Sequence, residues 1–154
     1  MDSDQLFEYC YASEDETKAF LQIALTGMLD FTSRVSQLEN SLSVSLGIVS
    51  TLTDKAIDDY WDLYKDMLEL QDLLSRHHYN AVRNGFGNQY DLLYNALESM
   101  REGTAYYICC IMEHTHLSVV APLTKPTEHQ IIKCSNTLNK KTKACMQKLN
   151  SIRF

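Results

Sequence analysis

The stretch Pro126–Phe154, PTEHQIIKCSNTLNKKTKACMQKLNSIRF, carries the clearest fold signal in the chain. Its apolar and small residues recur at alternating spacings of three and four, at Ile131, Cys134, Leu138, Thr142, Cys145, Leu149 and Ile152. That spacing places them on one narrow stripe of an α-helix. The other faces carry six Lys or Arg and no acid after Glu128. We therefore predict a helix that packs along its stripe and presents a basic surface elsewhere.

Three more segments, at about residues 17–46, 54–83 and 89–119, repeat apolar residues at helical spacing. In the second segment Trp61, Tyr64 and Leu68 form an additional stripe beside the main one, which predicts two packing neighbours. In the third segment the stretch 106–112 is apolar on nearly all sides and is expected to be buried. The apolar stripe of the whole third segment consists of Tyr90, Leu93, Leu97, Met100, Thr104, Tyr107 and Ile111.

Capping and turn residues mark several helix ends. Ser13, followed by Glu16, predicts an N-cap with a capping box before the first helix. The stretch 84–88, NGFGN, predicts a break after the second helix and offers Asn88 as the next N-cap. Pro126 suits the first turn of the last helix, because proline has no N–H to satisfy there.

The junction between the first two helices is ambiguous. Residues 41–48 alternate apolar and polar side chains, which is also the pattern of a strand. We favour a helix that ends in a turn near Gly47, because no partner for a solitary strand is predicted elsewhere. One unbroken helix over residues 17–82 is the alternative.

The expected fold is all-α, an antiparallel bundle of about four long helices with coiled-coil-like packing. Helices of about 26–30 residues, roughly 40–45 Å long, suit side-by-side packing, and short connections make neighbours antiparallel. The bundle is expected over residues 16–154, after an acidic, flexible N-terminus at 1–15. Two helical hairpins that share a seam with another chain fit the same pattern.

Composition and charge exclude several functional classes. The chain has 154 residues, 45% of them hydrophobic, which suits one globular domain. Its net charge of −6 argues against generic nucleic-acid binding. An acidic N-terminus, five cysteines and no long apolar run predict a cytoplasmic or nuclear protein with reduced thiols and no membrane span.

No catalytic or metal motif is present in full. Cys110 and His114 are one helical turn apart and could chelate an ion. Other candidate ligands are scattered, at Cys109, His116, His77, His78 and Cys134. The complete set of glutamates and Glu-x-x-His motifs of a di-iron bundle is missing, and so are the phosphate-loop and nucleophile motifs. We expect no enzyme activity, no cofactor and no metal site.

The remaining candidates are interaction surfaces. The lysines of the last helix either form a solvated face, open to pairing with acids of the 54–83 helix, or contact an acidic partner, and few aromatics are near them for base stacking. The aromatic residues near Trp61 are either core anchors or interface residues. The candidate partner interface comprises Tyr60, Trp61, Tyr64, Leu138, Lys140, Lys141, Cys145, Leu149 and Ile152.

The function predicted from these features is association. We expect a non-enzymatic scaffold or adaptor subunit that assembles with itself or with other helical chains. The small polar residues Thr104 and Thr142 at stripe positions favour this view, because such residues are common where two chains form a coiled coil. The alternative is a self-contained four-helix domain that binds a peptide or small ligand in an interhelical groove.

Overall fold

A computed structural model describes the backbone of residues 12–46, 54–120 and 125–154, and the side chains of 12–40, 57–112 and 130–154. All regular structure within these ranges is helical, as predicted. The helices are α2 (Glu14–Leu46), α3 (Asp54–Arg76), α4 (His78–Arg83), α5 (Gly87–Val120) and α6 (Lys125–Asn150). The expected flexible N-terminus lies mostly outside the described residues, as does the expected turn near Gly47, so both stay predictions.

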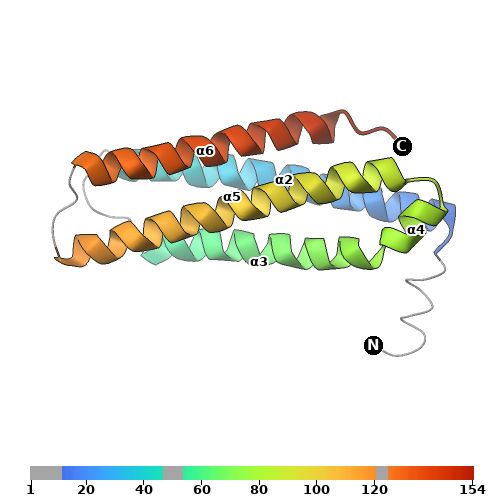
Figure 1. The fold of residues 1–154 in the computed structure, drawn as a ribbon, viewed down its shortest axis with the longest axis horizontal. Helices are drawn as coiled ribbons and strands as arrows, with labels where there is room; N and C mark the ends of the chain where they lie inside the picture. Colours follow the sequence, from blue (N-terminus) through green and yellow to red (C-terminus); the bar gives the residue numbers. More distant parts are fainter. Residues whose placement is uncertain (1–11, 47–53, 121–124) are drawn as a thin grey trace, which may run out of the picture.

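The four long helices lie lengthwise beside one another (Figure 1). α3 and α6 each contact both α2 and α5, which places α3 across the molecule from α6. The contact between α2 and α3 excludes one unbroken helix over residues 17–82, because the two halves of a straight helix cannot touch. No helix in the described ranges is both long and apolar enough to span a membrane.

The stripes predicted from the sequence form the core. All seven stripe residues of α6 and all seven of α5 are buried, as are Leu21, Met28 and Val35 of α2. The seam threonines lie in the core of this chain. Thr104 and Thr142 are buried within the monomer, and their hydroxyls donate at 2.8 Å to the carbonyls of Met100 and Leu138, one turn back on their own helices.

The predictions about packing neighbours and burial hold in part. α3 has the two expected neighbours, α2 and α5, but its second stripe is only partly covered, since Trp61 and Leu68 are 38% and 40% exposed. In the stretch 106–112 of α5, Tyr107 and Ile111 are buried, whereas Tyr106 and Met112 are 59% and 46% exposed. Both exposed faces have the same cause: each helix sits at a corner of the molecule and has an outward face.

The predicted helix 54–83 is interrupted at His77. The ring of this residue stacks on Phe20 of α2 with 3.7 Å between centroids, and α4 begins at the next residue. After α4, Gly85 adopts φ 85°, a conformation that favours glycine. The next helix begins at Gly87, so the N-cap expected at Asn88 is wrong.

Side chains from the α4 region secure the start of α2. The Asn84 amide donates to the carbonyl of Ala12 at 3.2 Å and to the hydroxyl of Thr17 at 2.8 Å, and Arg83 also donates to the Ala12 carbonyl. The predicted N-cap of α2 is confirmed, because the Glu16 N–H donates to the Ser13 hydroxyl at 3.1 Å. The bonds from Arg83 and Asn84 connect residues about 70 positions apart at one end of the molecule.

Candidate functional site

Each of the four long helices contributes one polar side chain to a buried cluster. Glu39 of α2 is 4% exposed and lies at its centre. The Tyr60 hydroxyl of α3 donates to one Glu39 carboxyl oxygen at 2.5 Å, and the Ser135 hydroxyl of α6 donates to the other. Tyr107 of α5 packs edge-on against Tyr60, with 5.1 Å between ring centroids. The cluster therefore links all four helices at one level.

The cluster contains an acid without a neighbouring base. Among the described side chains, no Lys, Arg or His forms an ion pair with Glu39. Burial raises the pKa of Glu39, while the hydrogen bonds from Ser135 and Tyr60 oppose that rise. Burial, together with the nearby Glu39 carboxyl, raises the pKa of Tyr60. Tyr60 therefore stays a hydrogen-bond donor to Glu39.

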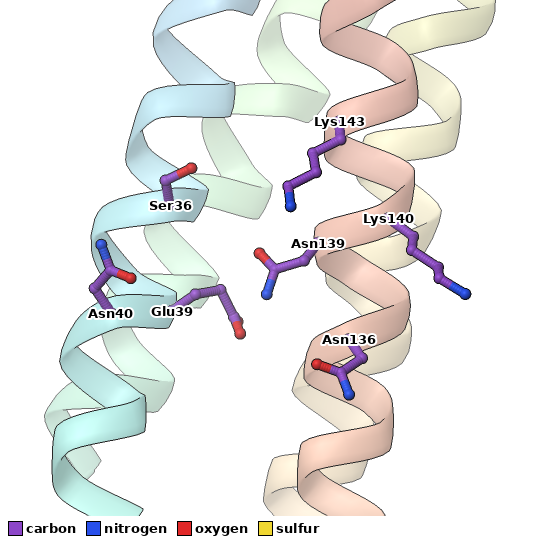
Figure 2. Close-up of a pocket in the computed structure, with 7 residues that line it drawn as sticks. All are labelled: Ser36, Glu39, Asn40, Asn136, Asn139, Lys140 and Lys143. Carbon is purple, nitrogen blue, oxygen red and sulfur yellow. The ribbon is translucent and has the colours of Figure 1, made fainter.

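A groove runs between α2 and α6 beside this cluster (Figure 2). It consists of two hollows of about 570 and 390 Å³ that share Ser36, Asn139 and Lys143. The first hollow is otherwise lined by Glu39, Asn40, Asn136 and Lys140. The second is otherwise lined by Leu29, Thr32, Ser33, Thr142, Met146 and Asn150. Small polar side chains thus leave open space where α2 faces α6.

The chemistry of the groove changes along its length. In the first hollow Asn139 and Lys143 reach from α6 toward α2, and Glu39 reaches back from α2 (Figure 2). The amides there both donate and accept hydrogen bonds, and the lysines only donate. In the second hollow Leu29 and Met146 add apolar surface. A partner with anionic or carbonyl groups beside apolar side chains suits this lining.

The basic surface of α6 forms no ion pair with the other residues that the structure describes. The ion pairs among the described residues are Arg34–Asp66, Arg76–Asp72 and Arg101–Glu98, and none involves a lysine of α6. The exposed lysines fit the expected solvated face, and no pairing with acids of α3 is found among the described side chains. The reason is geometric, because α3 lies across the molecule from α6.

The structure divides the predicted partner interface into two groups. Five of its residues are buried in the core of the chain itself: Tyr60, Leu138, Cys145, Leu149 and Ile152. They could contact a partner only if the fold opened. The other four have solvent access, but on opposite helices, since Trp61 and Tyr64 are on α3 whereas Lys140 and Lys141 are on α6. Partner binding by these four stays a prediction.

Sequence reasoning missed the groove residues. Glu39 lies four positions after Val35 and continues the buried stripe of α2, so an acid on an apolar stripe was the available signal. For Ser36, Asn136 and Asn139 no such signal exists. They are polar residues beside a stripe, and their role depends on two helices about 100 positions apart in the chain.

The cysteines and histidines with described side chains do not converge. Cys109 is exposed, whereas Cys110 and Cys134 are buried, and the ring of His78 packs beside Tyr90. Among the described side chains, no three His, Cys, Asp or Glu gather closely enough to hold a metal ion. The side chains of His114 and His116 lie outside the described part of the chain.

Comparison with known proteins adds no assignment to this geometry. The chain matches no family model, and no significant similarity connects it to a curated protein or to a solved structure.

Proposed function

We propose that this chain is a non-enzymatic protein-interaction subunit whose α2–α6 groove binds an acidic, partly apolar segment of a partner protein. In this proposal the four long helices form a self-contained antiparallel bundle with coiled-coil-like packing. The chain then acts as a scaffold or adaptor in the cytoplasm or nucleus. The localisation rests on the sequence alone.

The observation that carries the proposal is a groove bordered by lysines that form no ion pair among the described residues. Lys140 and Lys143 line it, and its one acid, Glu39, is buried and accepts two hydrogen bonds. The groove therefore presents positive charge without exposed negative charge. Leu29 and Met146 supply apolar contact area further along. Helix-in-groove recognition uses this combination of an apolar floor and charged edges.

An acidic partner is favoured over nucleic acid by the charge of the rest of the chain. Residues 1–124 contain 19 Asp and Glu against seven Lys and Arg. A long polyanion would be repelled by this acidic majority, whereas a short acidic segment could reach the basic groove alone. The described part of α6 also contains no aromatic side chain for base stacking.

Two designed peptides test the proposal. One is an amphipathic helix with Trp and Leu on one face and flanking Glu, and its counterpart has Lys in place of every Glu. Fluorescence anisotropy at low salt measures their binding to the whole chain. We expect the acidic peptide to bind at least about tenfold more tightly than the basic one, because complementary charge gives specificity. Added salt should weaken that binding.

Matched variants locate the binding surface. Lys140→Glu with Lys143→Glu reverses the charge of the groove and should abolish the preference for the acidic peptide. Lys133→Glu with Lys148→Glu makes the same change at exposed positions of α6 that do not line the groove, and it should keep the preference. Equal binding of both peptides, or equal loss in both variants, would contradict the proposal.

A further inference from the structure

The outward face of α3 combines apolar side chains with acids. Trp61 and Leu68 lie seven residues apart, about two helical turns, and both are more than a third exposed. Besides the exposed base Lys65, four exposed acids lie around them, at Asp58, Asp62, Glu69 and Asp72, so the face is acidic overall. Of these, only Asp72 forms an ion pair within the described part of the chain, with Arg76 on the same helix. Trp is enriched among the residues that contribute most of the binding energy at protein interfaces.

This face is complementary to the α2–α6 groove, because it carries acids where the groove carries lysines. The groove offers Lys140 and Lys143 in one hollow and Leu29 and Met146 in the other. The acids of α3 can pair with the first set, and its Trp61 and Leu68 can cover the second. The lengths also agree, because the groove is lined on α6 from Asn136 to Asn150 and the α3 face extends from Asp58 to Asp72, 15 residues each.

We propose that the groove of one copy binds the outward face of α3 from a second copy of the same chain. This inference rests on the proposed function and names its partner. A chain cannot fill its own groove in this way, because its α3 packs on α2 and α5 and lies across the molecule from α6. Charge complementarity between two unpartnered surfaces of one chain selects a second copy as the occupant.

The two surfaces differ, so the contact is heterologous. Each copy then has one groove and one α3 face to offer, and association continues from copy to copy until it closes in a ring or remains an open row. Because charged side chains contribute to it, the contact weakens as salt screens them. The proposal therefore predicts a mass in solution that rises with protein concentration at low salt.

Two variants of the whole chain test the contact. Lys140→Glu with Lys143→Glu damages the groove and leaves the α3 face intact. Trp61→Ala with Leu68→Ser damages the α3 face and leaves the groove intact, and neither residue is fully buried. Sedimentation velocity should show each variant alone as a monomer under conditions in which the unmodified chain associates. Circular dichroism should show the same helix content and a cooperative melt in all three proteins.

Mixing the two variants gives the decisive result. The variant with Lys140→Glu and Lys143→Glu keeps its α3 face, which fits the intact groove of the variant with Trp61→Ala and Leu68→Ser. No further contact is possible between them, so the mixture should form one-to-one pairs and nothing larger. The control pair, Lys133→Glu with Lys148→Glu, should associate as the unmodified chain does. A monomeric unmodified chain, variants that still associate, or a mixture without pairs would each overturn the proposal.

The test is separable from that of the proposed function. The Trp61→Ala, Leu68→Ser variant keeps its groove, so it should still bind the acidic helical peptide, at least as tightly as the unmodified chain, in which α3 of a second copy competes for the groove. Peptide binding without self-association would overturn the second copy as partner and leave the groove as an interaction site. Failure of the unmodified chain to prefer the acidic peptide would overturn both.

Discussion

At the scale of single residues, Glu39 links the core to the groove. A buried carboxyl without a cation contributes little stability by itself, because it loses its hydration. Its two hydrogen bonds come from hydroxyls on α3 and α6, so both are made only when the helices have one lengthwise alignment. Glu39 therefore specifies how the helices align more than it stabilises them.

Substitution of Glu39 by Gln should change how stability depends on pH. Burial raises the pKa of Glu39 in the folded chain above its ordinary value of 4.5, so the folded state holds a proton that the unfolded state releases. The stability from this group is complete below pH 4.5 and is lost as the pH rises through the folded-state pKa. Gln does not titrate. The unfolding free energy of Glu39→Gln relative to the unmodified chain should therefore rise over that interval and then level off.

Urea unfolding at a series of pH values between about 4 and 8 measures this difference. Glu69→Gln makes the same substitution on the exposed side of α3 and serves as the control. If the unfolding free energy of Glu39→Gln relative to the unmodified chain does not change with pH, or falls as the pH rises, the carboxyl is not held in the buried cluster.

The thiols should differ in reactivity. The Cys145 thiol is buried and donates to the carbonyl of Ala96 at 3.3 Å, and burial raises its pKa, so little thiolate is present at neutral pH. Cys109 is exposed. Maleimide labelling of the native chain, followed by peptide mass spectrometry, should modify Cys109 well before Cys145. If Cys109 and Cys145 were labelled at similar rates in the native chain, and if urea did not change those rates, the burial of Cys145 would be contradicted.

At the scale of helices, α5 and α6 approach closely at small residues. A Cβ placed on Gly103 would lie 3.2 Å from the Cδ of Lys141 and 3.3 Å from a Cδ of Leu138. The carbonyl of Ala96 also contacts the Cys145 thiol. Small side chains on α5 thus let α6 approach, and this contact holds α6 in place along one edge of the groove.

Two glycine substitutions should have unequal effects. Gly27 is inside α2, and a Cβ there would be 3.8 Å from Leu70, an ordinary contact, so Gly27→Ala should stabilise the chain by about 0.5–1 kcal/mol through helix propensity. Gly103→Ala should gain less because its contacts are tighter. Gly103→Leu should destabilise by about 1–3 kcal/mol because it forces α5 and α6 apart. Chemical denaturation of the three variants measures these values, and an equal gain from both alanines would contradict the close approach.

The helices themselves could be predicted from the sequence because each stripe repeats over many turns. The seven residues predicted for the α6 stripe are all buried, and so are the seven of α5. The break at His77 could not be predicted, because it accompanies a ring contact with Phe20, 57 positions earlier in the chain. Local periodicity predicts an element, whereas such long-range contacts decide where it is interrupted.

The candidate site was much less predictable than the helices. The lysines of the last helix were identified from sequence as a docking surface, and Lys140 does line the groove. Glu39, Ser36 and Asn139 were missed, because a groove depends on which two helices face each other across small side chains. Periodicity identifies the buried face of a helix but does not identify the neighbour it packs against.

At the scale of the whole molecule, charge is distributed unevenly. Residues 125–154 contain seven Lys and Arg against one acid, while the rest of the chain is acidic. The fold keeps this asymmetry, because α6 and the acid-rich α3 lie across the molecule from each other. Two complementary surfaces thus stay available for association, while the apolar stripes of α5 and α6 are buried within the monomer.

In the proposal made above, folding uses the apolar stripes within one chain, whereas association uses charged outer surfaces. Light scattering and circular dichroism of a dilute sample in about 1 M salt test this separation, because charges are then screened beyond about 3 Å. We predict a helical monomer of 17.7 kDa that melts cooperatively. A dimer that persists in this salt, or a chain that is helical only when associated, would show that the stripes join separate chains and would contradict the account.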